Sequence, residues 1–370
     1  MNRKYCFFIG LSFVFLLLCG CQNKKKEIGY YYEVPACQPF SKPIQDTTHV
    51  DCVIEPWFDG KEKAVVFTWD DCFHGIADVV DLFDKYGLKT TFFVHTVGID
   101  NLYLNFRYFY KGTLNRVLKR ALRNGHEISS HTHDHINLTK LTLAQVKDQF
   151  ELSSNLIHRK YGYYPSTLSH PESCYNESID SLMRLYFLDS RYSVENDKDT
   201  TIRYLQIRSS YPFVYYKKNF DSFIQSTSNE YVYGGHQLRK GYEPIAEATL
   251  DSLLSYITEK YGDLCWITTY EDVVLYKKTR AAVSVSNGKG LVKIDTSGIK
   301  EILDHYTHPH AFLTLKFNGA NLDFSSDGLV TYRFDGKDSY CTIDLRKSNE
   351  VLYYAVDEHF TIQEPMRNNY

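Results

Sequence analysis

The chain lacks three features that would each assign it to a class of protein at once. Its 370 residues balance 42 Lys and Arg against 45 Asp and Glu, which argues against a nucleic-acid partner. Its nine cysteines include no Cys-x-x-Cys pair, so no zinc ribbon is indicated. Its N-terminal apolar run, Phe7 to Leu18, is too short for a comfortable membrane span. What remains is the composition of a globular body that is long enough for two domains.

What the chain does contain is a strand-like segment that stops abruptly at two acids. Ala64 to Trp69 is an apolar run of the kind that forms a buried parallel strand, and Asp70 and Asp71 follow it directly. Folds built from parallel strands keep their chemistry at the carboxyl ends of those strands. Taken alone, such an acidic pair is also typical of a solvated turn or of the cap of the next helix.

Two histidines further along the chain favour a functional interpretation. His131 and His135 are four residues apart, so on a helical turn both imidazoles would face one point, as paired metal ligands do. Two exposed histidines on a surface helix would show the same spacing. One Asp and two His that follow strand-like segments are nevertheless typical of a metal centre. We therefore predict that one of the two acids binds a divalent ion together with His131 and His135.

These segments resemble two motifs of the polysaccharide deacetylases with a NodB homology domain, carbohydrate esterase family 4. The first motif is similar to Phe67-Thr68-Trp69-Asp70-Asp71, and the second is similar to the stretch from Gly125 to His135. The resemblance runs from about Lys63 to Tyr276. It implies an α/β fold, a distorted (β/α) barrel in which helices cover parallel strands.

The resemblance also implies a chemistry in which each group has its own role. Asp71, His131 and His135 would hold a divalent metal, with zinc as the first expectation and Co²⁺, Ni²⁺ or Mn²⁺ as alternatives. Asp70 would take the proton of the attacking water. His236, which follows the strand-like segment Glu230–Gly235, would protonate the departing amine. The predicted function is removal of acetyl groups from N-acetylated sugars of a polysaccharide or oligosaccharide.

Two other functions are compatible with the same residues. One is an O-acetyl esterase of the acetylxylan type, whose leaving group needs less protonation. The other is a carbohydrate-binding protein with a decayed site. The complete set of Asp70, Asp71, His131 and His135 argues against decay, because a pure binding protein has no need for adjacent buried acids.

The third and fourth motifs of the family are only partly present. Many members carry an Arg two residues before a Pro, and here Ser169 stands in that position before Pro171. The charge that orients the catalytic base is therefore missing from its usual place. Either His170 or Arg191 could fill that space. In the fourth motif the usual Asp-Trp pair is absent, and Asp189 fits the site or a strand cap equally well.

The predicted domain order has four parts. Residues 1–20 form a signal peptide, residues 21–62 an extended arm with little regular structure, residues 63–278 the catalytic domain, and residues 279–370 a β-rich accessory domain. Short β-rich runs separated by Asn-Gly and Asp-Gly turns predict that the last part is a small antiparallel sandwich. The aromatic-rich segment Ile99–Tyr110 predicts either a lid over the site or an excursion packed on the barrel.

The first residues resemble a bacterial lipoprotein signal. Arg3 and Lys4 precede the apolar run, and Leu18-Cys19-Gly20-Cys21 places a small residue directly before a cysteine. Cys21 would then carry lipid and tether the protein to a membrane of the cell envelope. An ordinary cleaved signal peptide or an uncleaved anchor would fit as well. In that oxidising compartment some of the remaining cysteines could pair, Cys37 with Cys52 being the simplest choice.

Overall fold

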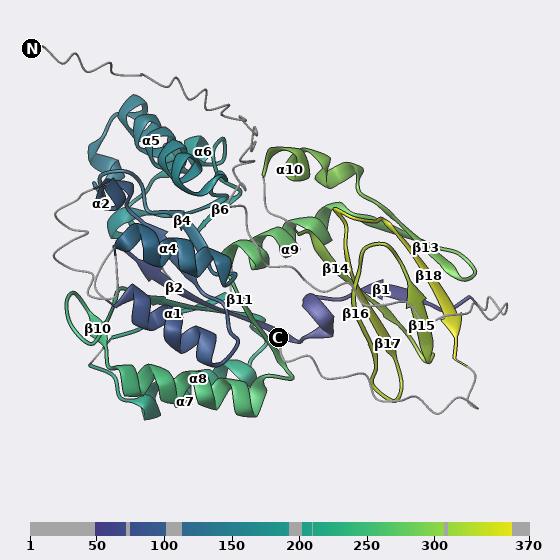
Figure 1. The fold of residues 1–370 in the computed structure, drawn as a ribbon. Coiled ribbons are helices and arrows are strands. Elements are labelled where there is room, and N and C mark those ends of the chain that lie inside the picture. Colours follow the sequence, from purple (N-terminus) through teal and green to yellow (C-terminus); the bar gives the residue numbers. More distant parts are fainter. Residues whose placement is uncertain are drawn as a thin grey trace, which may run out of the picture.

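The computed structural model describes residues 49–71, 75–100, 113–191, 202–208, 210–306 and 310–356. The described chain forms a helix-covered parallel sheet followed by a two-layered β sandwich, and these two bodies lie side by side (Figure 1). The predicted signal peptide and Cys21 lie outside the described residues, as does most of the predicted aromatic segment. Within the described ranges, no helix has the length and apolar character that crossing a membrane requires.

The parallel sheet is built around strand β2 (Lys63–Asp70), which is buried along its whole length. The other strands are β3 (Thr91–Val94), β4 (Glu127–Ser130), β5 (Thr167–Ser169), β6 (Asp189–Arg191), β7 (Ile202–Gln206), β8 (Glu230–Gly235) and β11 (Cys265–Thr268). Their order is β6-β5-β4-β3-β2-β8-β7, and β11 also pairs with β2.

Strand β2 explains why the barrel is distorted. Along one edge it pairs with β8 from Ala64 to Trp69. The other edge is shared, because Lys63–Val66 pair with β11 whereas Thr68–Asp70 pair with β3. The sheet therefore splits at this edge, and the predicted distorted barrel of parallel strands is confirmed.

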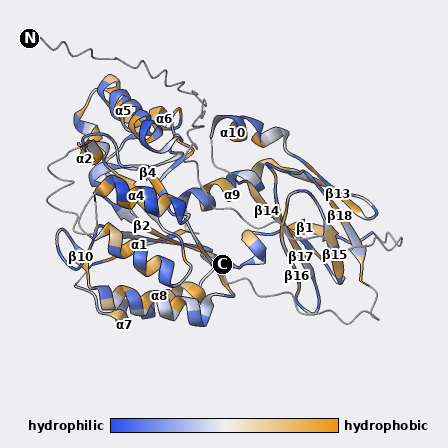
Figure 2. Ribbon diagram, in the orientation of Figure 1, coloured by the Kyte–Doolittle hydropathy of each residue, from blue (hydrophilic) through white to orange (hydrophobic). Residues whose placement is uncertain are grey.

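Helices pack on this sheet with their apolar faces inward. They are α1 (Ile76–Lys85), α2 (Thr96–Asp100), α4 (Leu114–Arg123), α5 (Leu143–Tyr161), α6 (Glu177–Met183), α7 (Phe213–Ile224), α8 (Glu247–Tyr261) and α9 (Tyr270–Ala282). Helix α5 shows how local sequence sets such an element, because Thr142 and Gln145 form a capping box at its start and Gly162, at φ 86°, ends it. Figure 2 shows α7 and α8 coloured both orange and blue along their length, as expected of helices with one buried face.

The C-terminal strands form two four-stranded antiparallel sheets, which confirms the predicted β-rich region. One sheet has the order β1-β14-β17-β16 and the other β12-β13-β18-β15. Their bounds are β1 (Cys52–Ile54), β12 (Ser284–Asn287), β13 (Leu291–Asp295), β14 (Phe312–Phe317), β15 (Leu322–Ser325), β16 (Leu329–Phe334), β17 (Ser339–Asp344) and β18 (Glu350–Ala355). A short helix, α10 (Lys300–His305), precedes β14. The inward residues of both sheets share one apolar core.

The prediction of an arm with little regular structure is wrong for the residues just before the barrel. Cys52–Ile54 form β1, which pairs with β14 and so completes a sheet of the sandwich. Trp57 then packs against Tyr276 of α9, with ring centroids 6.0 Å apart. The Tyr276 hydroxyl donates to the Glu55 carbonyl at 3.1 Å and accepts from the Thr314 N–H at 3.2 Å. The chain therefore crosses the sandwich before it enters the barrel.

The cysteines show no bridge among the described residues. Cys52, Cys174, Cys265 and Cys341 all carry free thiols. The predicted pairing of Cys37 with Cys52 is therefore not seen, and Cys37 itself lies outside the described residues. The Cys52 side chain packs against the core of the sandwich, and burial there raises the pKa of its thiol to about 12.

Candidate active site

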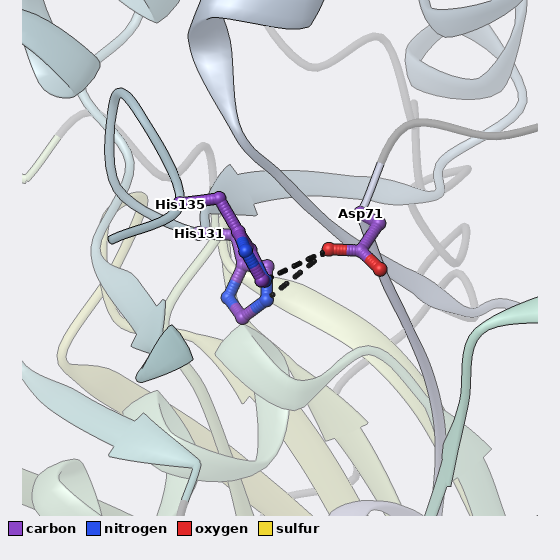
Figure 3. A group of neighbouring side chains, drawn as sticks. All are labelled: Asp71, His131 and His135. Atoms are coloured by element: carbon purple, nitrogen blue, oxygen red, sulfur yellow. Dashed lines mark ion pairs between the residues drawn. The ribbon is translucent and has the colours of Figure 1, made fainter. Parts of the chain in front are cut away.

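The three predicted ligands meet at the carboxyl ends of β2 and β4. Asp71 directly follows β2, and His131 directly follows β4. The Asp71 Oδ1 atom lies 3.1 Å from Nε2 of His135 and 3.6 Å from Nε2 of His131 (Figure 3). One ligand atom from each of the three side chains lies within 4.8 Å of the others. Elsewhere in the described ranges, no further group of three His, Cys, Asp or Glu is gathered as closely.

The predicted helical turn between the two histidines is wrong. Residues 131–135 form an irregular loop, in which Thr132 and His135 have φ angles of 66° and 56°. Asp71 has a φ of 71°. Non-glycine residues seldom adopt this left-handed conformation, which persists where the surrounding structure holds the backbone in place. The loop therefore brings the imidazoles together by tight backbone turns rather than by helical periodicity.

The surroundings of the three side chains suit metal binding. The His131 Nδ1 atom donates to the Ser169 carbonyl at 2.7 Å, which leaves the Nε2 lone pair directed at Asp71. Burial raises the pKa of Asp71, but the hydrogen bond with His135 and the nearby imidazoles outweigh it and lower that pKa overall. Burial lowers the pKa of His131. Asp71 is thus held ionised and His131 neutral, and these are the states in which both bind a cation.

Asp70 lies beside these ligands and is held by Arg191. An Nη2 hydrogen of Arg191 forms a salt bridge with Asp70 Oδ2, and the same nitrogen donates to Ser169 Oγ at 2.7 Å. Its Nη1 atom donates to the Tyr204 hydroxyl at 3.0 Å and to Thr68 Oγ1 at 3.2 Å. The other oxygen of Asp70, Oδ1, is buried and has no hydrogen-bond partner. One oxygen is therefore fixed, and the other is open to accept a proton.

His236 follows β8, the neighbour of β2. Because Trp69 pairs with Gly235, His236 and Asp70 occupy equivalent positions at the ends of adjacent strands. His236 is also close enough to Asp71 for its charge to contribute to the lowering of the Asp71 pKa. The structure thus brings together all five predicted site residues.

The two glycines before His236 have a packing role. A Cβ atom on Gly234 would lie 2.0 Å from the Tyr204 hydroxyl and 2.5 Å from Arg191 Nη1. A Cβ atom on Gly235 would lie 2.9 Å from the ring of Trp69. The glycines therefore leave room for the side chains that support Asp70.

Comparison with known proteins agrees with this geometry. Residues 59–188 match the family model described as polysaccharide deacetylase. This part of the chain therefore resembles a polysaccharide deacetylase domain. The matched range contains Asp70, Asp71, His131 and His135 but ends before Arg191 and His236.

Two curated relatives of this part of the chain are named as peptidoglycan deacetylases. The peptidoglycan-N-acetylglucosamine deacetylase PgdA of Listeria monocytogenes is 28% identical over 120 residues, which are 32% of this chain and 23% of that protein. The peptidoglycan-N-acetylmuramic acid deacetylase PdaC of Bacillus subtilis is 26% identical over 166 residues, 44% of this chain and 30% of that protein. The chain thus spans less than a third of the length of these two relatives.

Solved structures of similar domains were also found. Peptidoglycan deacetylase PdaC from Bacillus subtilis is 20% identical with a TM-score of 0.43, covering 61% of this chain and 96% of that one. A family 4 acetyl xylan esterase from Clostridium thermocellum, in complex with a cobalt ion, is 15% identical with a TM-score of 0.42, covering 57% of this chain and 90% of that one.

The structure decides which residue stands in for the missing arginine of the deacetylase domain. Of the two alternatives, Arg191 makes the salt bridge with Asp70. His170 instead stacks on Tyr175, with ring centroids 5.0 Å apart. Ser169, at the usual position of the arginine, accepts a hydrogen bond from Arg191. The guanidinium is therefore supplied by β6 rather than by the segment before Pro171.

Asp189 takes the role of a strand cap. It begins β6, and its Oδ1 atom accepts from the Ser190 N–H at 2.8 Å. Burial raises the pKa of its carboxyl. Because Asp189 and Arg191 lie at opposite ends of this short strand, only Arg191 reaches the carboxyl edge of the sheet.

Sequence reasoning missed the polar residues beside His236. Glu243 places Oε2 3.7 Å from the Nδ1 atom of His236, and its Oε1 atom lies 3.2 Å from Nη1 of Arg208. Tyr242 sets its ring at 87° to the imidazole, with centroids 4.9 Å apart. No motif marks these residues in the sequence, and the only signal is an acid a few residues after the histidine.

Proposed function

We propose that this protein is a metal-dependent hydrolase that removes acetyl groups from N-acetylated sugars of a polysaccharide or oligosaccharide. The observation that carries the proposal is Asp70, a buried carboxylate with one oxygen held by Arg191 and the other without a partner, next to Asp71, His131 and His135. A binding site would gain nothing from a buried acid that is only half satisfied.

The three ligands suit a divalent cation. One carboxylate oxygen and two imidazole nitrogens form the donor set that zinc accepts, and cobalt, nickel and manganese can use similar ligands. Such an ion, when bound by Asp71, His131 and His135, polarises an acyl oxygen and lowers the pKa of water. About a third of the His135 side chain (34%) is exposed, which leaves this side of the site accessible to water and substrate.

The remaining groups handle protons. Asp70 accepts a proton from the attacking water on its unpaired Oδ1 atom, while Arg191 keeps the carboxylate from rotating. His236 donates a proton to the departing nitrogen as the C–N bond breaks. The hydroxyl of water then remains on acetate, and the sugar leaves with a free amine.

The names of the curated relatives support an amide rather than an ester as substrate. The proteins from Listeria monocytogenes and Bacillus subtilis are both described as deacetylases of N-acetylated amino sugars. A bifunctional xylanase/deacetylase of Pseudobutyrivibrio xylanivorans is 21% identical over 141 residues, so the ester remains an outcome to be tested.

Acetate release by the chain from Gln22 onward tests the proposal. The protein is offered N-acetylglucosamine oligomers and acetylated xylan separately, before and after chelation and after zinc is returned. We expect release from the amino sugar that stops with chelator, returns with zinc and is lost in Asp70→Asn. Release from xylan alone would assign the protein to the esterases. If protein that holds metal releases acetate from neither substrate, both activities on these glycans would be rejected.

We also propose that lipid on Cys21 tethers the protein in the cell envelope. Support comes from the small residue before Cys21 and the polar Gln22-Asn23-Lys24-Lys25-Lys26 after it. Labelled palmitate should enter the wild-type protein and not Cys21→Ser. Labelling of both or of neither would contradict the tether.

A further inference from the structure

The imidazole of His236 has one nitrogen that the proposed reaction does not use. Its Nδ1 atom is buried and has no hydrogen-bond partner. The nearest carboxylate oxygen in ion-pair range is Oε2 of Glu243, 3.7 Å away. Both side chains are mostly shielded from water, with exposed fractions of 17% and 22%. A small rotation of either side chain would convert this approach into a hydrogen bond.

Glu243 is itself held in place by its neighbours. Gln206 donates a hydrogen bond from Nε2 to Glu243 Oε2, and Arg208 places Nη1 3.2 Å from Oε1. Arg208 also donates to Oε1 of Gln206 at 2.6 Å, so the two supports brace each other. The backbone of Glu243 has a φ of 41°, which a non-glycine residue adopts only where its surroundings enforce it.

The loop that carries Glu243 is closed by Gln237. This residue opens the short strand β9 (Gln237–Leu238), which pairs with β10 (Pro244–Ile245). The side-chain amide of Gln237 donates to the Lys240 carbonyl at 2.5 Å and accepts from the Tyr242 N–H at 3.2 Å. Glu243 therefore sits at the end of a braced turn, at a fixed distance from His236.

We propose that Glu243 is the positioning residue of His236. Its carboxylate accepts the Nδ1 hydrogen, stabilises the imidazolium and turns the Nε2 hydrogen toward the departing nitrogen. The inference rests on the proposed function, because it assigns a support to the general acid of that reaction.

Two substrates with different leaving groups test this role. The amide nitrogen of an N-acetylglucosamine oligomer must be protonated to leave, whereas the phenolate of 4-nitrophenyl acetate leaves without a proton. In zinc-loaded protein, Glu243→Gln should lower kcat on the oligomer by roughly 10- to 100-fold with KM little changed. Its activity on the aryl ester should stay within about threefold of wild type, because the attack on the acyl carbon does not use His236.

Glu247→Gln is the matched control. Glu247 lies on α8, is about as accessible as other surface acids and forms its ion pair with Arg239 rather than with His236. Glu247→Gln removes the same charge from the same region. We expect this variant to keep wild-type activity on both the oligomer and the aryl ester. An equal loss on both substrates in Glu243→Gln, or no loss on the oligomer, would overturn the proposal.

A second measurement tests the contact between Glu243 and His236 without relying on turnover. Nitrogen NMR of labelled histidine, with the His236 signals assigned from their absence in His236→Gln, reports which ring nitrogen carries the proton. In the neutral ring, we expect the proton on Nδ1 in wild type and a shift of population toward Nε2 in Glu243→Ala. An identical tautomer in both proteins would reject the contact. If the tautomer shifts but the wild type releases no acetate, the proposed function fails and the pairing stands.

Discussion

At the scale of single residues, the counter-charge of Asp70 comes from a distant part of the chain. Arg191 is 121 residues from Asp70, yet its guanidinium, 7% exposed, makes the salt bridge that holds the carboxylate. Ser169 accepts from the same nitrogen, and Gly234 leaves the room that the pair needs. Asp70 therefore depends on β6 and β8 as well as on its own strand.

Removal of the Arg191 charge should disable the base. In Arg191→Met, Asp70 keeps its buried position but loses its counter-charge and its orientation, and we expect kcat to fall roughly 100-fold. Acetate release under saturating substrate measures this. Arg184→Met is the control, since Arg184 pairs with Asp180 on the surface of α6 and should leave kcat unchanged.

The loss should be partly reversible if the guanidinium is supplied from the usual position. The Ser169 Oγ atom lies 2.7 Å from the Arg191 Nη2 atom, so an arginine at position 169 can reach the same oxygen of Asp70. We expect the double variant S169R/R191S to be more active than Arg191→Met. Full activity of Arg191→Met would show that Asp70 does not need the pair.

At the scale of elements, a buried carboxylate links β4 to α9. Glu127 begins β4 and is 1% exposed, and its Oε2 atom accepts from Thr91 Oγ1 at 2.7 Å and from the Glu271 N–H at 2.9 Å. Its other oxygen accepts from the Thr167 hydroxyl. Burial and the nearby Glu271 carboxylate raise the pKa of Glu127 above the ordinary 4.5. The strand and the helix thus meet at a carboxyl group that favours its neutral form.

This carboxyl group should make stability depend on pH. From about 4.5 up to the raised pKa, the native protein holds a proton on Glu127 that the unfolded chain has released. The contribution of Glu127 to the free energy of unfolding is therefore largest below pH 4.5, and it falls as the pH rises through that window. The side chain in Glu127→Gln cannot lose a proton. We therefore expect the free energy of unfolding of the variant, relative to wild type, to rise by up to about 1.4 kcal/mol per pH unit in that window.

Urea unfolding at several pH values measures this difference. The wild-type curve serves as the reference, because all other titrating groups are common to both proteins. A constant difference in the free energy of unfolding across the window would mean that Glu127 titrates alike in the folded and unfolded states.

At the scale of the whole molecule, β1 ties the two bodies together. It belongs to the sandwich by pairing, whereas Trp57, three residues after its end, packs against Trp266 of the barrel with ring centroids 6.3 Å apart. Phe58 and Phe312 meet across the same boundary, with centroids 5.1 Å apart. The sandwich and the barrel therefore share an apolar contact surface that the segment before the barrel completes.

A charge on the inner face of β1 should weaken the sandwich. Ile54 packs against its core, whereas Val53 points outward and is 47% exposed. We expect Ile54→Asp to lower the free energy of unfolding by about 2 kcal/mol or more, because an unpaired charge would be buried. Val53→Asp should stay within about 0.5 kcal/mol of wild type. Thermal and urea unfolding check both variants, and equal effects would mean that β1 does not pack as described.

The sequence by itself predicted the parallel-strand fold, the β-rich C-terminal region and a candidate site made of Asp70, Asp71, His131, His135 and His236. The strands were predictable because apolar runs are readable from local pattern, whereas the roles of the site residues came from the resemblance to polysaccharide deacetylases. Only the tertiary structure decided that Arg191 replaces the missing arginine, that Glu243 faces His236, that a loop joins the two histidines and that β1 completes the sandwich. Those features depend on contacts between distant segments, whereas hydrophobic periodicity predicts local elements but not which of them make contact.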